Sequence, residues 1–272
     1  MTRLPVPLPQ RREAFATTRR DAWYAQPIAV FLGLMAFVVY STWAALQGEH
    51  YFYENLLSPF YAPTLWDAPG IESGHAWFGA WPQWMPTWIP ATPALLILWA
   101  PGLFRFTCYY YRGAYYKAFW ADPIACGVGE PRSSYWGERT FPLILQNIHR
   151  YFLYIALLFI FILSYEAYVA MWFTNPETGN KEFGLGVGTI VLTVNAILLA
   201  GYTLGCHSLR HLVGGNCRKV SKAPLGKKTY DCVSCLNRRH MLWACLSLFW
   251  VGFADVYVRL CSMGIWTDWR IF

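Results

Sequence analysis

The sequence has few charged residues: Asp, Glu, Lys and Arg make up only 14% of its 272 residues. An ordinary soluble domain carries about 25%, so this composition excludes that class. The chain is instead 56% hydrophobic and 19% aromatic. Apolar runs of about 20 residues are long enough to cross a bilayer. The sequence predicts an all-α polytopic membrane protein, a bundle of five transmembrane helices near residues 27–47, 88–108, 149–173, 186–212 and 240–263.

Lys and Arg are almost absent from one set of connections, and this asymmetry predicts the orientation. Of the 22 Lys and Arg residues, 19 fall in residues 1–26, 105–150 or 210–239. The positive-inside rule assigns those segments to the cytoplasm. We therefore expect residues 1–26 to form a cytoplasmic N-terminal arm, followed by a five-helix membrane-anchor domain over 27–272. The asymmetry explains the net charge of +7, so membrane lipid is expected as a partner and nucleic acid is not.

Disulfides are not expected either, although the chain has eight cysteines. Most of them lie at or near the predicted cytoplasmic face, where thiols stay reduced. Thiols and imidazoles instead gather between the last two apolar segments. Soft thiolates beside imidazoles are ligands of zinc and of mixed-ligand iron–sulfur centres. The candidate metal ligands are Cys206, His207, His211, Cys232, Cys235 and His240.

A Rieske-type [2Fe–2S] cluster is the first interpretation of these residues. In such a cluster two thiolates hold one iron and two imidazoles hold the other. Cys206 precedes His211 by five residues, and Cys235 precedes His240 by the same number. Each arm of a helix hairpin would then donate one thiolate and one imidazole.

Other ligand arrangements remain open. A variant of the cluster takes both thiolates from Cys232 and Cys235, with His207 or His211 in place of the Cys206 arm. Two histidines from neighbouring helices would instead suit axial ligation of haem b. A Cys₂His₂ zinc site that clips the hairpin is the third interpretation, and a chain without metal, in which these side chains are caps or core residues, is the fourth.

Charged residues also occur inside the predicted spans. Charges at such depth are costly and are usually paired or functional. Asp255 and Arg259 are one helical turn apart, so we expect them to neutralise each other. Glu166 has no obvious partner in the sequence, and we expect it to carry protons.

Three stretches of the sequence carry a resemblance to a known family: Gly201-Tyr-Thr-Leu-Gly-Cys-His-Ser-Leu-Arg-His-Leu-Val-Gly-Gly215, Leu236-Asn-Arg-Arg-His-Met241 and Phe253-Ala-Asp-Val-Tyr-Val258. Over the last three predicted helices the chain resembles the membrane-anchor subunits of succinate dehydrogenases and fumarate reductases from actinobacteria. The resemblance implies a five-helix anchor in the bacterial plasma membrane, bound to a flavoprotein and an iron–sulfur subunit. Such an anchor passes electrons from succinate to menaquinone and is not catalytic alone.

The resemblance also implies haem b ligands among His207, His211 and His240. This chain departs from the family pattern at Cys232-Val-Ser-Cys235, and that departure favours a cluster over haem alone.

A quinone headgroup is expected near the cytoplasmic face, where electrons and protons reach it. The candidate groups for binding it are Tyr135, Trp136, His149, Arg150 and Arg239.

Two other classes of protein compete with the electron-transfer subunit: a zinc-clipped membrane scaffold or transporter, and a stand-alone b-type cytochrome. Metal analysis with EPR spectroscopy separates the three.

Overall fold

Four helices in the described part of the chain are long and apolar enough to cross a membrane. The computed structural model describes residues 13–132, 140–141, 143–175, 177–214 and 224–272. The long helices are α1 (Ala25–Gln47), α5 (His149–Val169), α6 (Val187–Leu204) and α9 (His240–Ser262). Helices suit this environment because hydrocarbon offers no partner to an unpaired backbone group. The all-α membrane class is confirmed, whereas the count of five spans is not.

The second predicted span, 88–108, is divided into two short helices. They are α2 (Pro93–Ile97) and α3 (Trp99–Phe106), separated at Leu98. Pro101 explains the break, because a proline ring collides with the carbonyl four residues earlier in a helix, here that of Ile97. The single span predicted over 88–108 is therefore two short helices in the structure.

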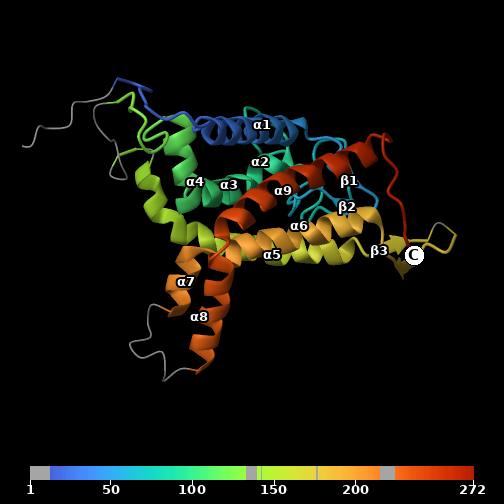
Figure 1. Cartoon of the computed structure of the whole chain (residues 1–272). Coiled ribbons are helices and arrows are strands. Elements are labelled where there is room, and N and C mark those ends of the chain that lie inside the picture. Colours follow the sequence, from blue (N-terminus) through green and yellow to red (C-terminus); the bar gives the residue numbers. More distant parts are fainter. Residues whose placement is uncertain (1–12, 133–139, 142, 176, 215–223) are drawn as a thin grey trace, which may run out of the picture.

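The fourth predicted span, 186–212, is also broken, at Gly205 and Cys206. α6 ends at Leu204, and α7 (His207–Gly214) leaves the bundle in a new direction. The chain returns along α8 (Pro224–Asn237), a helix where the sequence predicted only a connection. Figure 1 shows α7 and α8 side by side, projecting from one end of the bundle. We call this the hairpin end.

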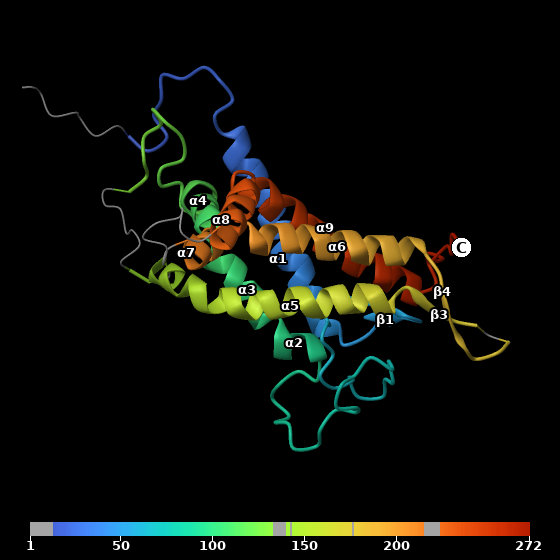
Figure 2. The same cartoon turned by 90° about the horizontal axis from the view of Figure 1, so that it is seen from below.

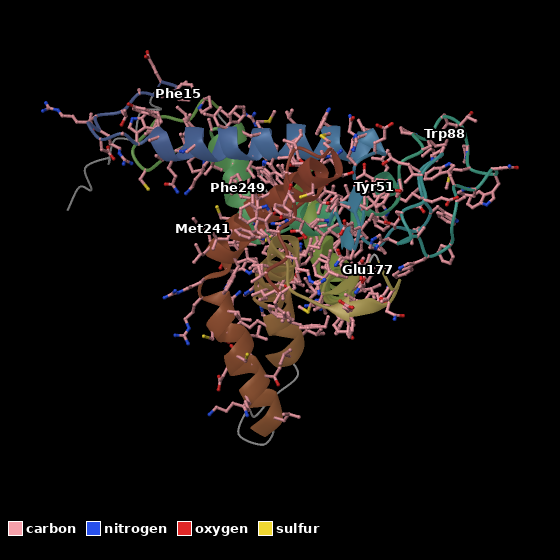
Figure 3. The ribbon with its side chains drawn as sticks, turned by 90° about the vertical axis from the view of Figure 1, so that its right-hand side faces the viewer. Phe15, Tyr51, Trp88, Glu177, Met241 and Phe249 are labelled. Carbon is pink, nitrogen blue, oxygen red and sulfur yellow. The ribbon has the colours of Figure 1, made fainter. Side chains whose placement is uncertain are left out.

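The opposite end, the loop end, is covered by the connection between α1 and α2. β1 (Phe52–Tyr53) pairs with β2 (Leu56–Leu57), and the rest of the loop folds beside α2 (Figure 2). Tyr51 is buried while Trp88 lies at the outer edge (Figure 3). A second antiparallel pair, β3 (Trp172–Thr174) with β4 (Lys181–Phe183), joins α5 to α6.

Shorter elements complete the hairpin end. They are α4 (Tyr109–Ala114), a π-helical turn (Tyr115–Phe119) and a 3₁₀ turn (Leu143–Ile148) that leads into α5. The described residues before α1 lie against the connection that follows the π-helical turn: the Phe15 amide donates to Gly129 O at 2.8 Å, and the Arg19 guanidinium donates to Cys126 O at 2.9 Å.

α6 and α9 approach each other closely because α6 carries a glycine at their contact. A Cβ atom on Gly201 would lie 2.7 Å from the Trp243 ring, closer than any packed side chain tolerates. The close approach brings the end of α6 beside the start of α9, at the hairpin end of the bundle (Figure 1).

Candidate functional site

Four buried thiol and imidazole groups meet at the hairpin end of the bundle. Cys108 follows α3, His149 is the first residue of α5, Cys206 lies in the break between α6 and α7, and His240 is the first residue of α9. Each comes from a different segment, and all four are buried. We call these residues the thiol–imidazole cluster.

Its first half pairs His149 with Cys206. The His149 Nε2 atom lies 3.1 Å from Cys206 Sγ, and its Nδ1 atom lies 2.8 Å from Thr107 Oγ1. Thr107 donates its one hydroxyl hydrogen to Leu103 O at 2.7 Å, so it accepts from His149. Nδ1 therefore carries the imidazole hydrogen, and the Nε2 lone pair faces the thiol. Phe104 stacks on the ring at a centroid distance of 4.6 Å.

Its second half pairs His240 with Cys108. The His240 Nε2 atom lies 3.7 Å from Cys108 Sγ. Its Nδ1 atom is buried and has no hydrogen-bond partner among the described residues. Tyr202 stacks on the ring at 5.0 Å, and Tyr110 packs at 4.8 Å. A buried unpaired nitrogen is costly, so this atom marks a place where a ligand would be favourable.

The break after α6 is what brings Cys206 into this cluster. Asn237, at the end of α8, donates to Gly205 O at 2.7 Å and fixes the turn. A Cβ atom at Gly205 would lie 2.7 Å from Gly201 O and 3.3 Å from His240 Nδ1. Only glycine fits between the helix end and the imidazole.

A cavity of about 310 Å³ adjoins the cluster, and all four members line it. Gln146 also lines it, and both polar atoms of its side chain are buried without a partner in the described chain.

Burial raises the pKa of the Cys206 thiol to about 11. Cys206 lies beyond the end of the α6 span, and at neutral pH without a metal it is a neutral thiol.

The metal ligands predicted from sequence are only partly brought together. Cys206 and His240 belong to the cluster. His207 lines the same cavity, but it is exposed and its Nε2 lies 3.0 Å from that of His211 on α7. Partial desolvation of its ring, and then repulsion from His211, lower the pKa of His207.

The Cys232-x-x-Cys235 motif lies elsewhere, with both side chains exposed on α8. Among the described residues no group of three or more His, Cys, Asp or Glu side chains is close enough to hold a metal ion in the form shown. The donors of the cluster form two separate pairs.

The predicted quinone-binding residues do not form one group either. His149 is in the cluster, whereas Arg150 and Arg239 are exposed. Tyr135 and Trp136 lie outside the described residues.

A second, more apolar cavity of about 440 Å³ runs among α1, α3, α5, α6 and α9. Phe104 and Tyr202, whose rings stack on the two imidazoles, also line this cavity. Its polar side chains are Arg105, Tyr202 and Thr203 towards the hairpin end and Ser41 and Thr42 towards the loop end. Arg105 donates to Tyr111 Oη at 2.8 Å and to Ser247 Oγ at 3.0 Å.

Two charged groups lie at the loop end of the helices. Asp255 and Arg259 form a buried ion pair at 3.4 Å, which confirms their predicted neutralisation. Glu166 is buried and faces His75 of the long loop at 3.6 Å, a partner that the sequence did not reveal.

Sequence reasoning missed Cys108 and did not assign His149 to the metal. A signal was available: Cys108, His149 and His240 are terminal residues of three predicted spans, and Cys206 lies near the end of a fourth. All four therefore belong to one predicted membrane face.

The fold and this cluster define a class: a multi-pass helical membrane subunit with buried thiols and imidazoles at one membrane face. The family described as actinobacterial succinate dehydrogenase subunit SdhC matches residues 25–264. A chain of the solved Mycobacterium smegmatis Sdh1 complex in the apo form is 41% identical, with a TM-score of 0.84, and the match covers 98% of this chain and 96% of that one. The comparison with curated proteins gives no match.

This chain therefore belongs to the actinobacterial succinate dehydrogenase SdhC family. It is the membrane-anchor subunit of a succinate dehydrogenase complex and is not catalytic alone. The family predicted from three short stretches of sequence is confirmed.

Proposed function

We propose that this chain carries electrons from a partner iron–sulfur subunit to menaquinone, within a succinate:quinone oxidoreductase that also contains a flavoprotein. The thiol–imidazole cluster would hold a Rieske-type [2Fe–2S] centre, and the hairpin end would face the partner subunits in the cytoplasm. The observation that supports this most directly is the convergence of two buried cysteines and two buried histidines from four segments.

The residues fit such a centre in donor type, number and surroundings. A Rieske-type centre needs two thiolates and two imidazoles, and Cys108, Cys206, His149 and His240 supply them. Nδ1 of His240 has no partner among the described residues. The lone pair of His149 Nε2 faces the Cys206 thiol and would become free to bind a metal once that thiol loses its proton to form a thiolate ligand. Histidine ligands in metal sites usually donate their other ring N–H to a neighbouring acceptor, as His149 does to Thr107.

Haem b fits this arrangement less well. Axial ligation needs two imidazoles that face each other across a macrocycle. Here each Nε2 atom instead faces a thiol, at 3.1 Å for His149 and 3.7 Å for His240. A zinc ion accepts the same Cys₂His₂ donors, so the metal has to be identified chemically.

A bound [2Fe–2S] centre supplies a one-electron carrier at this position. The residues of this chain would bury it and fix the orientation of the imidazoles. Phe104 and Tyr202 separate the two imidazoles from the 440 Å³ cavity, which places that cavity one aromatic ring away from the cluster.

Menaquinone is proposed to occupy the 440 Å³ cavity. Ligand pockets typically measure about 300–1,000 Å³, with apolar walls and a few polar groups. The volume and lining here match that description. Arg105 and Thr203 would hydrogen-bond the headgroup oxygens at the hairpin end, and the apolar remainder would take the isoprenoid chain.

The purified complex with its partner subunits tests this assignment. The H149A/H240A variant should lose the reduced EPR signal of the membrane subunit and reduce quinone at a small fraction of the wild-type rate. Reduction of a soluble dye that accepts electrons from the partner subunits should persist.

Two matched controls separate the cluster from the ligands predicted first. C232S/C235S removes the exposed thiols of α8, and H211A removes the exposed imidazole of α7. Both should keep iron content and quinone reduction. Stoichiometric zinc without iron, a haem absorption band, or loss of the signal in C232S/C235S would contradict the proposal.

A further inference from the structure

Glu166 and His75 form a buried pair at the loop end, far from the thiol–imidazole cluster. Glu166 lies in the last turn of α5, 17 residues after His149, which corresponds to about 26 Å along the helix. Its Oε2 atom is 3.6 Å from His75 Nδ1, and the two side chains are only 8% and 10% exposed. Among the described residues, His75 is the partner with which Glu166 forms an ion pair.

A network inside the loop holds the backbone beside His75 in place. The His75 amide donates to Ser73 Oγ at 3.1 Å, and Ser73 Oγ donates to Asp67 Oδ1 at 2.5 Å. Tyr51 donates to the same carboxylate oxygen at 2.9 Å. These hydrogen bonds fix this part of the loop, so the His75 imidazole lies beside Glu166 in a defined position.

The partners of His75 define where its hydrogens lie. Its Nε2 atom faces the Glu54 carbonyl oxygen at 3.4 Å. A carbonyl oxygen can only accept, so Nε2 carries a hydrogen. The pair then has two favourable states: Nδ1 without a hydrogen opposite a protonated Glu166, or Nδ1 with a hydrogen, giving an imidazolium opposite an ionised Glu166. Both states have zero net charge, so a proton can move within the pair without leaving an isolated charge in the bilayer.

His75 lies beside an exposed turn of the loop, and Glu166 lies one helical turn from a residue that lines the proposed quinone cavity. On one side, His75 contacts Glu54, an exposed residue of the turn between β1 and β2. On the other side, Leu163, one helical turn before Glu166 and on the same helix face, lines the 440 Å³ cavity. The Ser41 and Thr42 hydroxyls lie along the same cavity, where they offer hydrogen-bond partners for water.

We propose that His75 and Glu166 transfer protons between the solution at the loop end and the quinone cavity. This inference rests on the proposed function. Succinate loses two electrons and two protons to become fumarate, and the quinone gains two electrons and two protons to become the quinol. The electrons enter from the hairpin end and the protons enter through His75 and then Glu166. For each electron and proton that meet in the cavity, the net effect is equivalent to the movement of one positive charge from the loop side to the hairpin side.

Substitutions in the purified complex test the pair. E166Q keeps a hydrogen-bonding side chain but cannot carry a proton, and H75N removes the imidazole. Each should slow quinone reduction about tenfold or more, within the range that a lost proton-transfer group costs. E166D, which keeps a carboxylate, should recover much of the rate. E166Q/H75N should be no slower than the slower single variant, because both residues serve one path.

Controls separate proton transfer from a structural role. Dye reduction by the partner subunits should be unchanged in every variant, as should co-purification of the subunits. E182Q changes an exposed carboxylate of β4 at the same end and should behave as wild type. If the pair only fastens the loop, E166Q will match wild type, and the proposal is overturned.

A second measurement depends on the sidedness of the protons. The complex is placed in liposomes, and a potassium gradient with valinomycin sets the membrane potential. A potential positive on the loop side should accelerate quinone reduction in wild type, and this acceleration should be absent in E166Q. Quinone reduction that does not respond to potential in wild type would contradict proton entry at the loop end. A complete absence of quinone reduction would instead contradict the proposed function.

Discussion

Thr107 determines which ring nitrogen of His149 carries the hydrogen. It accepts from His149 Nδ1 only because its own hydrogen is directed to Leu103 O. Such partners of a metal-ligating histidine typically change metal affinity by about 10–100-fold when removed. A substitution at Thr107 therefore tests the hydrogen bond to His149 without removing any member of the thiol–imidazole cluster.

T107V should retain the shape of the side chain and lose the acceptor. Because His149 Nδ1 is then buried without a partner, we expect iron to be lost to a chelator about 10–100-fold more readily. T107S, which keeps the hydroxyl, is the control. Iron retention is measured against time of exposure to the chelator, and equal retention in T107V and wild type would exclude a role for this hydrogen bond.

Asp255 is the most constrained charged residue of the loop end. It accepts from Tyr40 Oη at 2.5 Å and also contacts Ser58 and Arg259. Arg259 in turn donates to Glu49 O at 2.9 Å. The ion pair thus ties α1 and the long loop to α9.

D255N should be strongly destabilising, because it leaves the Arg259 charge buried without a counterion. Breaking one partner of a buried pair typically costs about 3–5 kcal/mol, measured here by thermal unfolding of the purified subunit in detergent. R270Q breaks the exposed Arg270–Glu182 contact and should cost under about 1 kcal/mol. Similar losses in both variants would show that burial does not govern the effect.

At the scale of elements, the break between α6 and α7 decides where the thiol of Cys206 points. The sequence did not predict it, since the predicted span continued through Gly205 to residue 212 and contains no proline. Its cause is long-range: Asn237 caps the turn, and the His240 ring occupies the space that a Cβ atom would need.

G205A should therefore displace His240 or Cys206 and lower the iron content of the purified complex, with helical content unchanged by circular dichroism. G113A is the matched control, because nothing lies within 4 Å of a Cβ atom there, and alanine is the better helix former. A G205A complex with full iron content would show that the close contact is not required.

Element boundaries that depend on local signals were predicted well. α9 begins at His240 and α1 ends at Gln47, as expected from the apolar runs. Pro101 explains the break between α2 and α3 once the structure is known. The sequence alone did not show that this segment would form two short helices instead of one span. α8 was missed because its apolar residues are sparse and its stability comes from packing on α7, through contacts such as that of Arg210 with Tyr230 at 2.7 Å.

At the scale of the whole molecule, the sequence allowed the family and the membrane face of the site to be predicted, but not the set of four donors. Spacing along the chain favoured His211 and Cys235, which are near Cys206 and His240 in sequence. Cys108 and His149 are distant in sequence and reach the cluster only through the packing of α3 against α5 and of α5 against α6. The partner of Glu166 was hidden for the same reason, since His75 lies 91 positions earlier.

The separation of the four donors along the chain has a consequence for biogenesis. Cys108 and His240 lie 132 positions apart, and the segments that carry Cys206 and His149 lie between them. A cofactor held by all four side chains could be inserted only after the ribosome has made the chain as far as α9. The helices would then enter the membrane and pack before any such cofactor is bound, and the machinery that delivers it would have to recognise a folded apoprotein rather than a nascent chain.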